Sequence, residues 1–548
     1  MLIKGRSLKS GQTFSRRKKA EAIFAHCLIS PKVVQEFIDR PRESHTWMKG
    51  LKRKELEDLV YPDWDQFEKE PFQHQLVSIA LGIAYPQFLH LLDMGLGKSA
   101  IWLALLRYYK AERGLGRSLI LVPRAVNVES WTKQIKIHAP NLTYAKLLGS
   151  AEDREQLIET DADLLIMNYA GLMVYMTEFG TGKKNKQKRF PVQSKVNKFV
   201  KRFANGGLIL DESHKMLGSQ DSLVHRLTSR VAKQCMVRFG GTGTLFGRDP
   251  LKAWSQFKVV DDGETLGPTM SLFRQAFYKG GVNHFGGIDW RFDSSMEKDV
   301  HRIIQHRSIR YEDAEVQDLP DVVSNVIPIE LTAEQKLYYN KAVEALTQSR
   351  GDFRLTDSFF HRTRQITAGF MGLKSDEGEK AEYVFEDNPK LEALLSLLES
   401  VPIDTKVVIF HYYRFTGQLI ELALAELGVK NYAVLRGGVK RPIDHYNRFL
   451  NDPGCSVLVA NTESGGTGID ELQNVSRFVI FYELPPSTSE FWQAWKRVYR
   501  TGQKRRVYRY LLEAVGTVDE KVWGFIEEGR DLFKAICEGR RDAQLRKI

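Results

Sequence analysis

The sequence predicts an α/β protein with two parallel-sheet lobes in tandem, a small helical N-terminal region and short inserts. Two series of short apolar strands separated by helical segments support this fold class, one between Phe88 and Gly240 and the other between Val407 and Phe481. The length of 548 residues points the same way, because it exceeds what one hydrophobic core accommodates. We therefore expect two or three domains.

The strand–helix alternation divides the chain into five expected parts. These are an N-terminal accessory helical region (1–65), a first lobe (66–265), a helical linker or insert region (266–389), a second lobe (390–515) and a C-terminal helical tail (516–548). In the first part, an apolar stripe at helical spacing predicts packing against another helix; its members are Val33, Val34, Phe37 and Ile38. The basic run 16–19 is interpreted as a solvated face, with DNA contact as the alternative.

Charge and cysteine usage narrow the class of protein. The 80 basic residues exceed the 68 acidic ones, and the net charge of +12 suggests a polyanionic partner, although many basic proteins have solvated positive surfaces. The four cysteines lie far apart and form no CxxC pair, so the sequence favours a reducing compartment and disfavours a disulfide framework or a zinc module.

No segment of the sequence predicts membrane insertion or secretion. The most apolar window, 76–92, is interrupted by Gly82, Pro86 and His90, and is interpreted as a core helix followed by a strand. The basic N-terminus lacks an apolar signal core and a cleavage site. We expect an intracellular protein, cytoplasmic or nuclear.

The first lobe opens with a candidate phosphate-binding loop. An apolar strand at 88–92 leads into a glycine-rich turn that ends in Lys98-Ser99, and an apolar helix follows at 100–106. This context directs backbone N–H groups and a helix N-terminus at phosphates, Lys98 at the β and γ oxygens, and the Ser99 hydroxyl at Mg²⁺. Leu92 stands where the general GxxxxGK[ST] motif has its first glycine. A GK[ST] triplet alone is weak evidence, so further signals are needed.

The second strong signal is Asp211-Glu212 at the end of the apolar strand 207–210. Asp211 is suited to hold Mg²⁺ through water, and Glu212 to polarise the attacking water beside the γ-phosphate. An acidic turn after a core strand is common by chance. The combination of a glycine-rich loop with a later strand that ends in Asp-Glu is much less often accidental. A further loop, 240–244, carries hydroxyls that can link nucleotide state to domain movement.

Several other segments complete the first lobe and the linker. Strands are expected at 119–123, 164–169 and 322–329, and helices at 131–138, 295–309 and 332–346. The segment 180–202 carries nine Lys and Arg residues and is expected to be an exposed loop. Phosphate contact and a merely solubilising insertion are equally good explanations of its charge.

The second lobe is expected to contain strands at 407–410, 432–435, 457–460 and 478–481, and no phosphate loop of its own. Near its end, Arg497 and Arg500 are three residues apart, so on a helix they would share a face and point at one phosphate. The planar guanidinium suits the charge of a phosphoryl transition state. Without the first lobe, two surface arginines on a basic helix would be the better interpretation.

Taken together, the motifs resemble those of the Snf2-type members of helicase superfamily 2, a group of double-stranded DNA translocases. The matches run in order over 71–530: 71–75 resembles the adenine-sensing Q motif, 93–99 motif I, 211–214 motif II, 242–244 motif III, 465–470 motif V and 493–503 motif VI. The family's loop also lacks the first glycine, as Leu92 does here. The ending Arg500-Thr501-Gly502-Gln503 is the most family-specific piece, since RNA helicases of the superfamily usually end motif VI in R-x-G-R.

Three positions depart from the family pattern. Ser213 replaces the usual alanine, Asp470 stands where asparagine is more frequent, and Tyr499 stands where histidine is usual. These changes bear on the coupling between nucleotide and DNA more than on ATPase chemistry. Chromatin-reader modules are absent and the inserts are short, so the resemblance favours a compact member of the family.

The resemblance implies two RecA-like lobes with ATP and Mg²⁺ in the cleft between them. The implied catalytic residues are Lys98, Asp211, Glu212, Arg497 and Arg500, and the implied metal-binding residues are Ser99 and Asp211. The nucleotide would also be contacted by Gln75, Met94, Gly95, Leu96, Gly97, Lys98, Ser99, Ala100, Gly468, Asp470 and Gln493.

The function that follows is an ATP-dependent, monomeric translocase that moves on duplex or branched DNA largely independently of sequence. Branch migration, fork remodelling or protein displacement would be the outcome. Three alternatives stay open: an RNA or single-strand helicase of the same superfamily, the motor subunit of a DNA restriction or defence complex, and a nucleotide-switched scaffold that hydrolyses ATP poorly.

Overall fold

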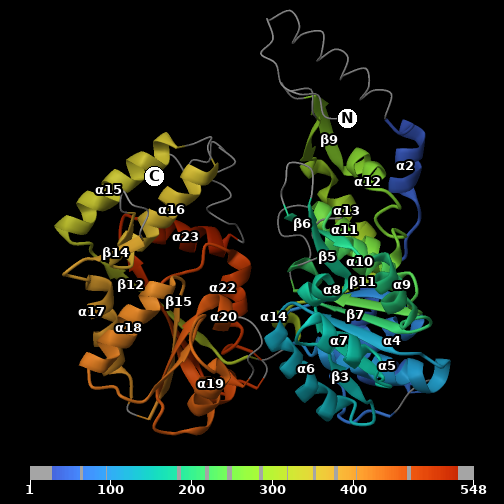
Figure 1. Cartoon of the computed structure of the whole chain (residues 1–548), viewed down its shortest axis with the longest axis horizontal. Coiled ribbons are helices and arrows are strands. Elements are labelled where there is room, and N and C mark those ends of the chain that lie inside the picture. Colours follow the sequence, from blue (N-terminus) through green and yellow to red (C-terminus); the bar gives the residue numbers. More distant parts are fainter. Residues whose placement is uncertain are drawn as a thin grey trace, which may run out of the picture. The chain divides into compact units, whose positions relative to one another are not determined.

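A computed structural model of the chain describes residues 28–61, 66–93, 95–181, 187–215, 217, 221–243, 250–282, 288–316, 319–349, 353–374, 380–402, 404–465, 471–500 and 502–528. The chain forms two compact units, Met1–Val316 and Gln317–Ile548. Each unit is built on its own parallel sheet (Figure 1).

The first unit contains a seven-stranded sheet whose described strands are all parallel. Their order across the sheet is β11 (Ser308–Tyr311), β1 (Gln87–Leu92), β8 (Val237–Gly241), β7 (Gly207–Asp211), β2 (Ser118–Val122), β4 (Leu164–Asn168) and β3 (Tyr144–Lys146). Because the strands are parallel, their carboxyl ends meet at one edge of the sheet, which is where ligands bind in such folds.

Helices cover both faces of this sheet. Side chains alternate along a strand, so Leu89 and Leu91 of β1 belong to one buried cluster, whereas Phe88 and Leu92 belong to another. The first cluster includes residues of α2 (Pro31–Asp39), α7 (Ala151–Ile158), α8 (Tyr169–Met176), α9 (Gln193–Lys201), α10 (Leu223–Ala232), α11 (Pro250–Asp261), α12 (Met270–Phe277) and α13 (Glu297–Ile304). The second includes residues of α3 (Arg53–Val60), α4 (Gln73–Ala84), α5 (Lys98–Arg113) and α6 (Ala125–His138).

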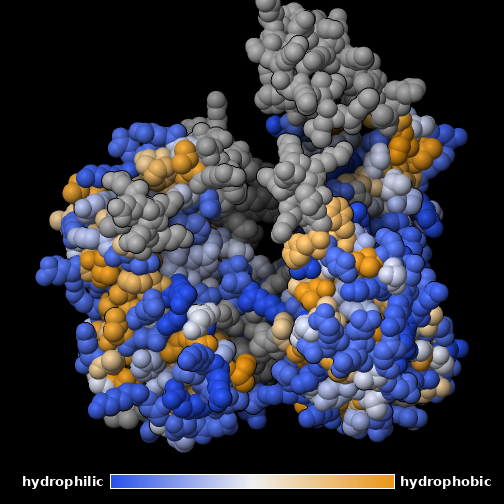
Figure 2. All heavy atoms as spheres, viewed as in Figure 1, coloured by the Kyte–Doolittle hydropathy of each residue, from blue (hydrophilic) through white to orange (hydrophobic). Residues whose placement is uncertain are grey.

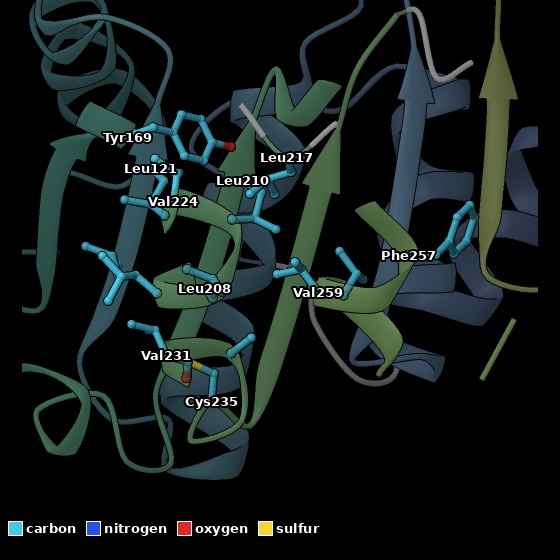
Figure 3. Packing of buried hydrophobic residues seen from close by; sticks show 14 of the residues in the cluster. Leu121, Tyr169, Leu208, Leu210, Leu217, Val224, Val231, Cys235, Phe257 and Val259 are labelled. Carbon is cyan, nitrogen blue, oxygen red and sulfur yellow. The ribbon is translucent and has the colours of Figure 1, made fainter. Parts of the chain in front are cut away.

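The first cluster is dense beneath α10 and α11. Figure 3 shows Leu208 and Leu210 of β7 on the same side of the sheet as Val224 and Val231 of α10. Three of the four residues of the expected apolar stripe of α2 pack as predicted: Ile38 is buried in this cluster, Val34 and Phe37 pack against it, and the Phe37 ring lies 6.1 Å from that of Phe277 in α12. The fourth, Val33, is exposed.

The second unit contains a six-stranded parallel sheet. Its order is β12 (Val322–Ile329), β19 (Val507–Ala514), β18 (Ser476–Phe481), β15 (Lys406–His411), β17 (Val457–Asn461) and β16 (Tyr432–Leu435). Its helices are α15 (Ala333–Gln348), α16 (Phe353–Thr367), α17 (Pro389–Ser400), α18 (Arg414–Glu426), α19 (Pro442–Asn451), α20 (Thr462–Gly465), α21 (Leu472–Val475), α22 (Thr488–Trp495) and α23 (Val518–Glu527). The predicted fold class of two RecA-like parallel-sheet lobes is confirmed.

Two segments differ from the expectation. The described residues of the basic segment 180–202 are mostly not loop. They belong to the antiparallel pair β5 (Thr177–Thr181) and β6 (Gln187–Pro191) and to α9, whose Val196, Phe199 and Val200 are buried; residues 182–186 lie outside the described residues. The helix expected over 295–309 ends at Ile304, because Ser308–Tyr311 pairs with β1 as β11.

Further hairpins and short helices complete the described structure. They are β9 (Tyr278–Val282) with β10 (Ile288–Phe292), β13 (Phe370–Lys374) with β14 (Lys380–Val384), η1 (Thr46–Gly50), η2 (Ser213–Lys215), η3 (Ser294–Met296) and α14 (Asp313–Val316). Among the described residues, none of the helices has the length and apolar character needed to span a bilayer. Hydrophilic residues dominate the visible face of each unit, with smaller hydrophobic patches between them (Figure 2).

Candidate functional site

The glycine-rich loop lies where β1 meets α5, at the carboxyl edge of the first sheet. Gly95 and Gly97 have φ of 92° and 77°, which is the left-handed region that glycine adopts without strain. Lys98 is the first residue of α5 and is 92% buried. Its Nζ donates to the carbonyl oxygens of Leu92 (2.8 Å) and Asp93 (3.2 Å). The amine is therefore held at the end of the strand, beside the helix N-terminus.

Two side chains of α4 lie on this loop. Gln75 accepts a hydrogen bond from the Phe72 backbone N–H (2.9 Å) and donates to the Leu96 carbonyl (3.4 Å). His74 Nε2 lies 2.9 Å from the same carbonyl, so this nitrogen carries the proton. A Cβ at Gly97 would come within 2.1 Å of Gln75 Nε2. Gln75 thus packs directly on the loop, and its predicted adenine contact stays a prediction.

Asp211 is the last residue of β7. In the sheet, β8 lies between β7 and β1. The Trp131 indole N–H of α6 donates to Asp211 Oδ2 (2.9 Å), and the Tyr169 hydroxyl donates to the Asp211 carbonyl (3.1 Å). Burial, together with the adjacent charge of Glu212, raises the pKa of Asp211 to about 6. A bound divalent cation would act in the opposite direction, since it stabilises the charged carboxylate.

Glu212 follows in a left-handed conformation with φ of 46°, which is uncommon for a non-glycine residue. Its Oε1 lies 4.0 Å from Lys98 Nζ and its Oε2 lies 3.3 Å from His214 Nδ1. The Thr242 hydroxyl, at the end of β8, lies 2.7 Å from the same His214 nitrogen. The structure therefore brings the phosphate-loop lysine, the acidic pair and the threonine of the 240–244 loop together at one sheet edge.

The remaining predicted residues of the first unit lie in the same region or outside the described residues. Ser99 and Ala100 belong to the first turn of α5. Outside the described residues lie Met94, Thr244, Gly468 and Asp470.

In the second unit, the two predicted arginines are not on one helix. Helix α22 contains Gln493, whose amide donates to the Ser489 hydroxyl (3.2 Å), but it ends at Trp495. Arg497 and Arg500 follow in consecutive turns, where Arg497 N–H donates to Ala494 and Gln503 N–H donates to Arg500. The expectation that both arginines lie on one helix is therefore wrong, and their alignment toward one phosphate stays a prediction.

The glutamine that ends motif VI has a structural role in the second unit. Gln503 is buried, and its amide donates to the carbonyls of Ser476 (3.0 Å) and Val498 (3.3 Å) while its oxygen accepts from Arg505 N–H (3.1 Å). These bonds join the arginine-bearing turns to the start of β18.

Sequence reasoning missed Glu483, which follows β18 at the carboxyl edge of the second sheet. Its carboxylate accepts hydrogen bonds from the Tyr412 and Tyr413 backbone N–H groups (2.7 and 3.0 Å) and from the Thr416 hydroxyl (2.7 Å). Burial raises the pKa of Glu483 above its usual range. The sequence does carry a signal for Glu483, because it is an acidic residue shortly after a buried strand. The same pattern identified Asp211.

The protein-family model described as SNF2-related domain matches residues 89–379, just over half of the chain. A probable ATP-dependent DNA helicase of Arabidopsis thaliana is 23% identical over 454 residues, which cover 78% of this chain and 39% of that protein. An uncharacterized ATP-dependent helicase of Mycoplasma genitalium is 24% identical over 450 residues, which cover 81% of this chain and 39% of that protein.

Among solved structures, the SWI2/SNF2 ATPase core of Sulfolobus solfataricus in complex with dsDNA is similar to this chain with a TM-score of 0.39 and 21% identity, over 88% of this chain and 97% of that one. The chain spans about two fifths of the length of the two curated relatives. The family-model match covers the phosphate loop and the acidic pair. The chain belongs to the family of proteins that contain a SNF2-related domain.

Proposed function

We propose that this protein is an ATP-driven motor that moves on duplex or branched DNA. The observation that carries the proposal is the approach of Lys98 Nζ to Glu212 Oε1 (4.0 Å), next to the buried Asp211, at the carboxyl edge of the first sheet. A basic group for phosphates, a carboxylate for a metal and a carboxylate for water are what phosphoryl transfer to water needs. Membership of the SNF2-related family supports the same activity.

The donor set fits a Mg²⁺–ATP complex. Serine hydroxyl and carboxylate oxygens are the hard ligands that Mg²⁺ prefers, and Ser99 and Asp211 supply them from α5 and β7. Bound Mg²⁺ would neutralise charge on the β and γ phosphates. Lys98 would exchange the Leu92 and Asp93 carbonyls for phosphate oxygens, and Glu212 would orient the attacking water.

The other nucleotide contacts belong to the same proposal. We propose that Gln75 contacts the adenine. The phosphates would be contacted by the backbone of the loop and of the first turn of α5, at Met94, Gly95, Leu96, Gly97 and Ala100. From the second unit, Arg497 and Arg500 would stabilise the transition-state charge, and Gln493, Gly468 and Asp470 would contact nucleotide. The five-part division of the chain also stays a proposal.

DNA is proposed as the substrate because of the net charge of +12 and the family. Contacts to backbone phosphates would make binding largely independent of sequence and steeply dependent on salt. Translocation would serve branch migration, fork remodelling or protein displacement by a monomeric motor. A DNA substrate implies an intracellular site of action, cytoplasmic or nuclear.

ATP turnover measured with duplex DNA, a branched junction, single-stranded DNA, RNA and no nucleic acid tests the proposal. We expect strong stimulation by duplex or junction, and its loss in Glu212→Gln, which keeps the shape of the side chain and removes its charge. Glu315→Gln, an exposed carboxylate that pairs with Lys49, is the matched control and should keep full turnover. Stimulation mainly by RNA or single strands would contradict the proposal, and so would equal turnover in Glu212→Gln.

A further inference from the structure

The first unit has another concave site, which lies at the opposite edge of the sheet from the glycine-rich loop. It is a groove of about 630 Å³ between α10, α11 and the start of α12, and we call it the basic groove. Arg238, the second residue of β8, reaches it, whereas the Thr242 that follows β8 belongs to the candidate ATP site. Because Arg238 N–H donates to Pro86, just before β1, the groove lies at the amino edge of the sheet. It is therefore separate from the nucleotide site.

The walls of the basic groove are strongly cationic. Five of its lining residues are basic (Arg226, Arg230, Lys233, Arg238 and Lys258), and Asp262 is its single acidic lining residue. Arg226 and Arg230 of α10 and Lys233, which follows its last residue in helical conformation, are spaced by four and three residues and so share one face. The carboxylate of Asp261, the last residue of α11, is buried nearby and accepts from the Gly263 and Thr265 N–H groups of the following turn.

Three of these cations have no hydrogen-bond or ion-pair partner within the described part of the chain, although the charge of Asp262 acts on Lys233 and Arg238. Arg230 donates to the side chains of Gln193 and Asn197, and Lys258 pairs with Asp262 (2.8 Å). The side chains of Arg226, Lys233 and Arg238 make no hydrogen bond or ion pair with any described residue.

Arg238 cannot be explained as a solvated surface charge. It is 92% buried, and its Nε has no hydrogen-bond partner among the described residues. Burial lowers the pKa of Arg238, with only partial compensation from the charges of Asp261 and Asp262. A basic residue near the C-terminus of a helix, such as Lys233, can complement the helix dipole, but this reason does not apply to an arginine on a strand. Asp261 and Asp262 offset only part of the cost of burying this charge, so a further anion in the groove would stabilise the guanidinium.

The opposite wall supplies a further positive element. Thr269 caps the N-terminus of α12 by accepting from Leu272 N–H (3.3 Å), and Thr269, Met270 and Ser271 line the groove. The N-terminus of a helix carries partial positive charge and favours phosphate groups. Cationic side chains and a helix N-terminus therefore converge on one space.

We propose that the basic groove binds a small polyphosphate-bearing solute, whose phosphates contact Arg226, Lys233 and Arg238. The volume lies within the range of about 300–1,000 Å³ that is usual for small-molecule sites. The recessed guanidinium favours a compact ligand over the backbone of a DNA duplex, whose phosphates lie on a convex surface. A polyphosphate bound in the basic groove would contact α10, α11 and the start of α12 at once, so a ligand other than ATP could change how these helices pack.

Inorganic tripolyphosphate is the probe, and calorimetry on the full chain is the measurement. The background is Lys98→Ala, so that the glycine-rich loop does not contribute and the result does not depend on the proposed ATPase activity. We expect Arg226→Gln/Lys233→Gln to weaken binding by about tenfold or more, because each lost charge-assisted hydrogen bond weakens affinity strongly. The matched control, Lys54→Gln/Lys136→Gln, removes two exposed lysines from other helices and should bind as the background does.

Arg238→Met tests the buried guanidinium while keeping an unbranched side chain, and its fold is checked by circular dichroism. Its binding should fall as in the groove variant. Equal weakening in the control pair would show non-specific attraction and overturn the proposal, as would unchanged binding in the groove variant. If the affinity for a duplex oligonucleotide also falls about tenfold in the groove variant, the groove binds nucleic acid instead of a small solute.

Discussion

At the scale of single residues, Trp131 is the side chain that holds the Asp211 carboxylate in place. Its indole N–H donates to Oδ2 (2.9 Å), and its ring stacks on Trp102 with 6.0 Å between centroids. Asp211 is buried beside another carboxylate, so losing this donor would leave it with fewer bonds in its charged form. If Asp211 binds Mg²⁺ as proposed, Trp131 is a positioning residue for it.

Trp131→Phe keeps the stacking and removes the donor. We expect the Mg²⁺ concentration for half-maximal ATP turnover to rise about tenfold, since a hydrogen bond to a charged group contributes about 1.5–3 kcal/mol. The control is Trp254→Phe, which removes a buried indole hydrogen bond to the Gly267 carbonyl. An unchanged Mg²⁺ requirement in Trp131→Phe, or the same rise in the control, would show that Trp131 does not position the metal ligand.

Glu483 gives a prediction about pH. Its raised pKa means that the folded state favours the protonated form, so the stability that this group contributes is present at low pH and is lost as pH rises through the folded pKa. Gln cannot ionise and keeps an oxygen for the Tyr412 and Tyr413 N–H groups. Relative to wild type, Glu483→Gln should gain stability as pH rises from about 4 to 8. Urea-denaturation midpoints at each pH measure this, and a constant difference between the two proteins would refute it.

The sequence predicts the site residues that act through short motifs, and not those that support them. Lys98 and Asp211 stand at the ends of apolar strands, and the structure places them at the expected sheet edge. Trp131 acts on Asp211 across 80 positions of sequence, and Glu483 acts on Tyr412 across 71, so no local pattern reveals these contacts.

At the scale of elements, most of the apolar strands were predictable because they are buried on both faces of a parallel sheet, as β2 and β15 are. Where the structure differs from the prediction, tertiary packing determined the secondary structure of the segment. Charge in 180–202 suggested a loop, yet Val196, Phe199 and Val200 have helical spacing and bury one face of α9. In β11, Ser308–Tyr311 continues a helical-looking sequence, but pairing with β1 makes it a strand.

A buried ion pair joins two helices of the second unit. Lys390 of α17, which is 99% buried in its side chain, pairs with Asp519 of α23. The same carboxylate accepts from the Thr367 hydroxyl (3.1 Å) and Ala514 N–H (3.3 Å), so Asp519 connects α17, α16, β19 and α23. Removing one partner would leave the other charge buried.

Asp519→Ala should therefore lower the free energy of unfolding by about 3–5 kcal/mol, measured by chemical denaturation. Asp519→Ala combined with Lys390→Met should recover most of this loss, because the unpaired charge is gone. An exposed pair, Lys336 with Glu330, provides the comparison, and Glu330→Ala should change stability by less than about 1 kcal/mol. A similar small effect in Asp519→Ala would mean that solvent reaches Lys390.

At the scale of the whole molecule, the length predicted more than one domain, and each of the two units has its own sheet and its own pair of buried clusters. The proposed chemistry is divided between them. The glycine-rich loop and the acidic pair belong to the first unit, whereas Arg497 and Arg500 belong to the second. This division allows binding and hydrolysis to be tested apart.

A fragment of residues 1–316 should fold, because its sheet and its clusters are complete without the second unit. It should bind Mg²⁺–ATP through Lys98, Ser99 and Asp211, yet turn over ATP at least a hundredfold more slowly than the full chain, since an arginine that stabilises the transition state contributes about 10³–10⁵ in rate. The full chain with Arg497→Ala/Arg500→Ala should match the fragment in both properties. Fluorescent-nucleotide binding and phosphate release measure them. Turnover by the fragment at the rate of the full chain would remove the arginines from the mechanism, and an unfolded fragment would show that the first unit depends on the second for stability.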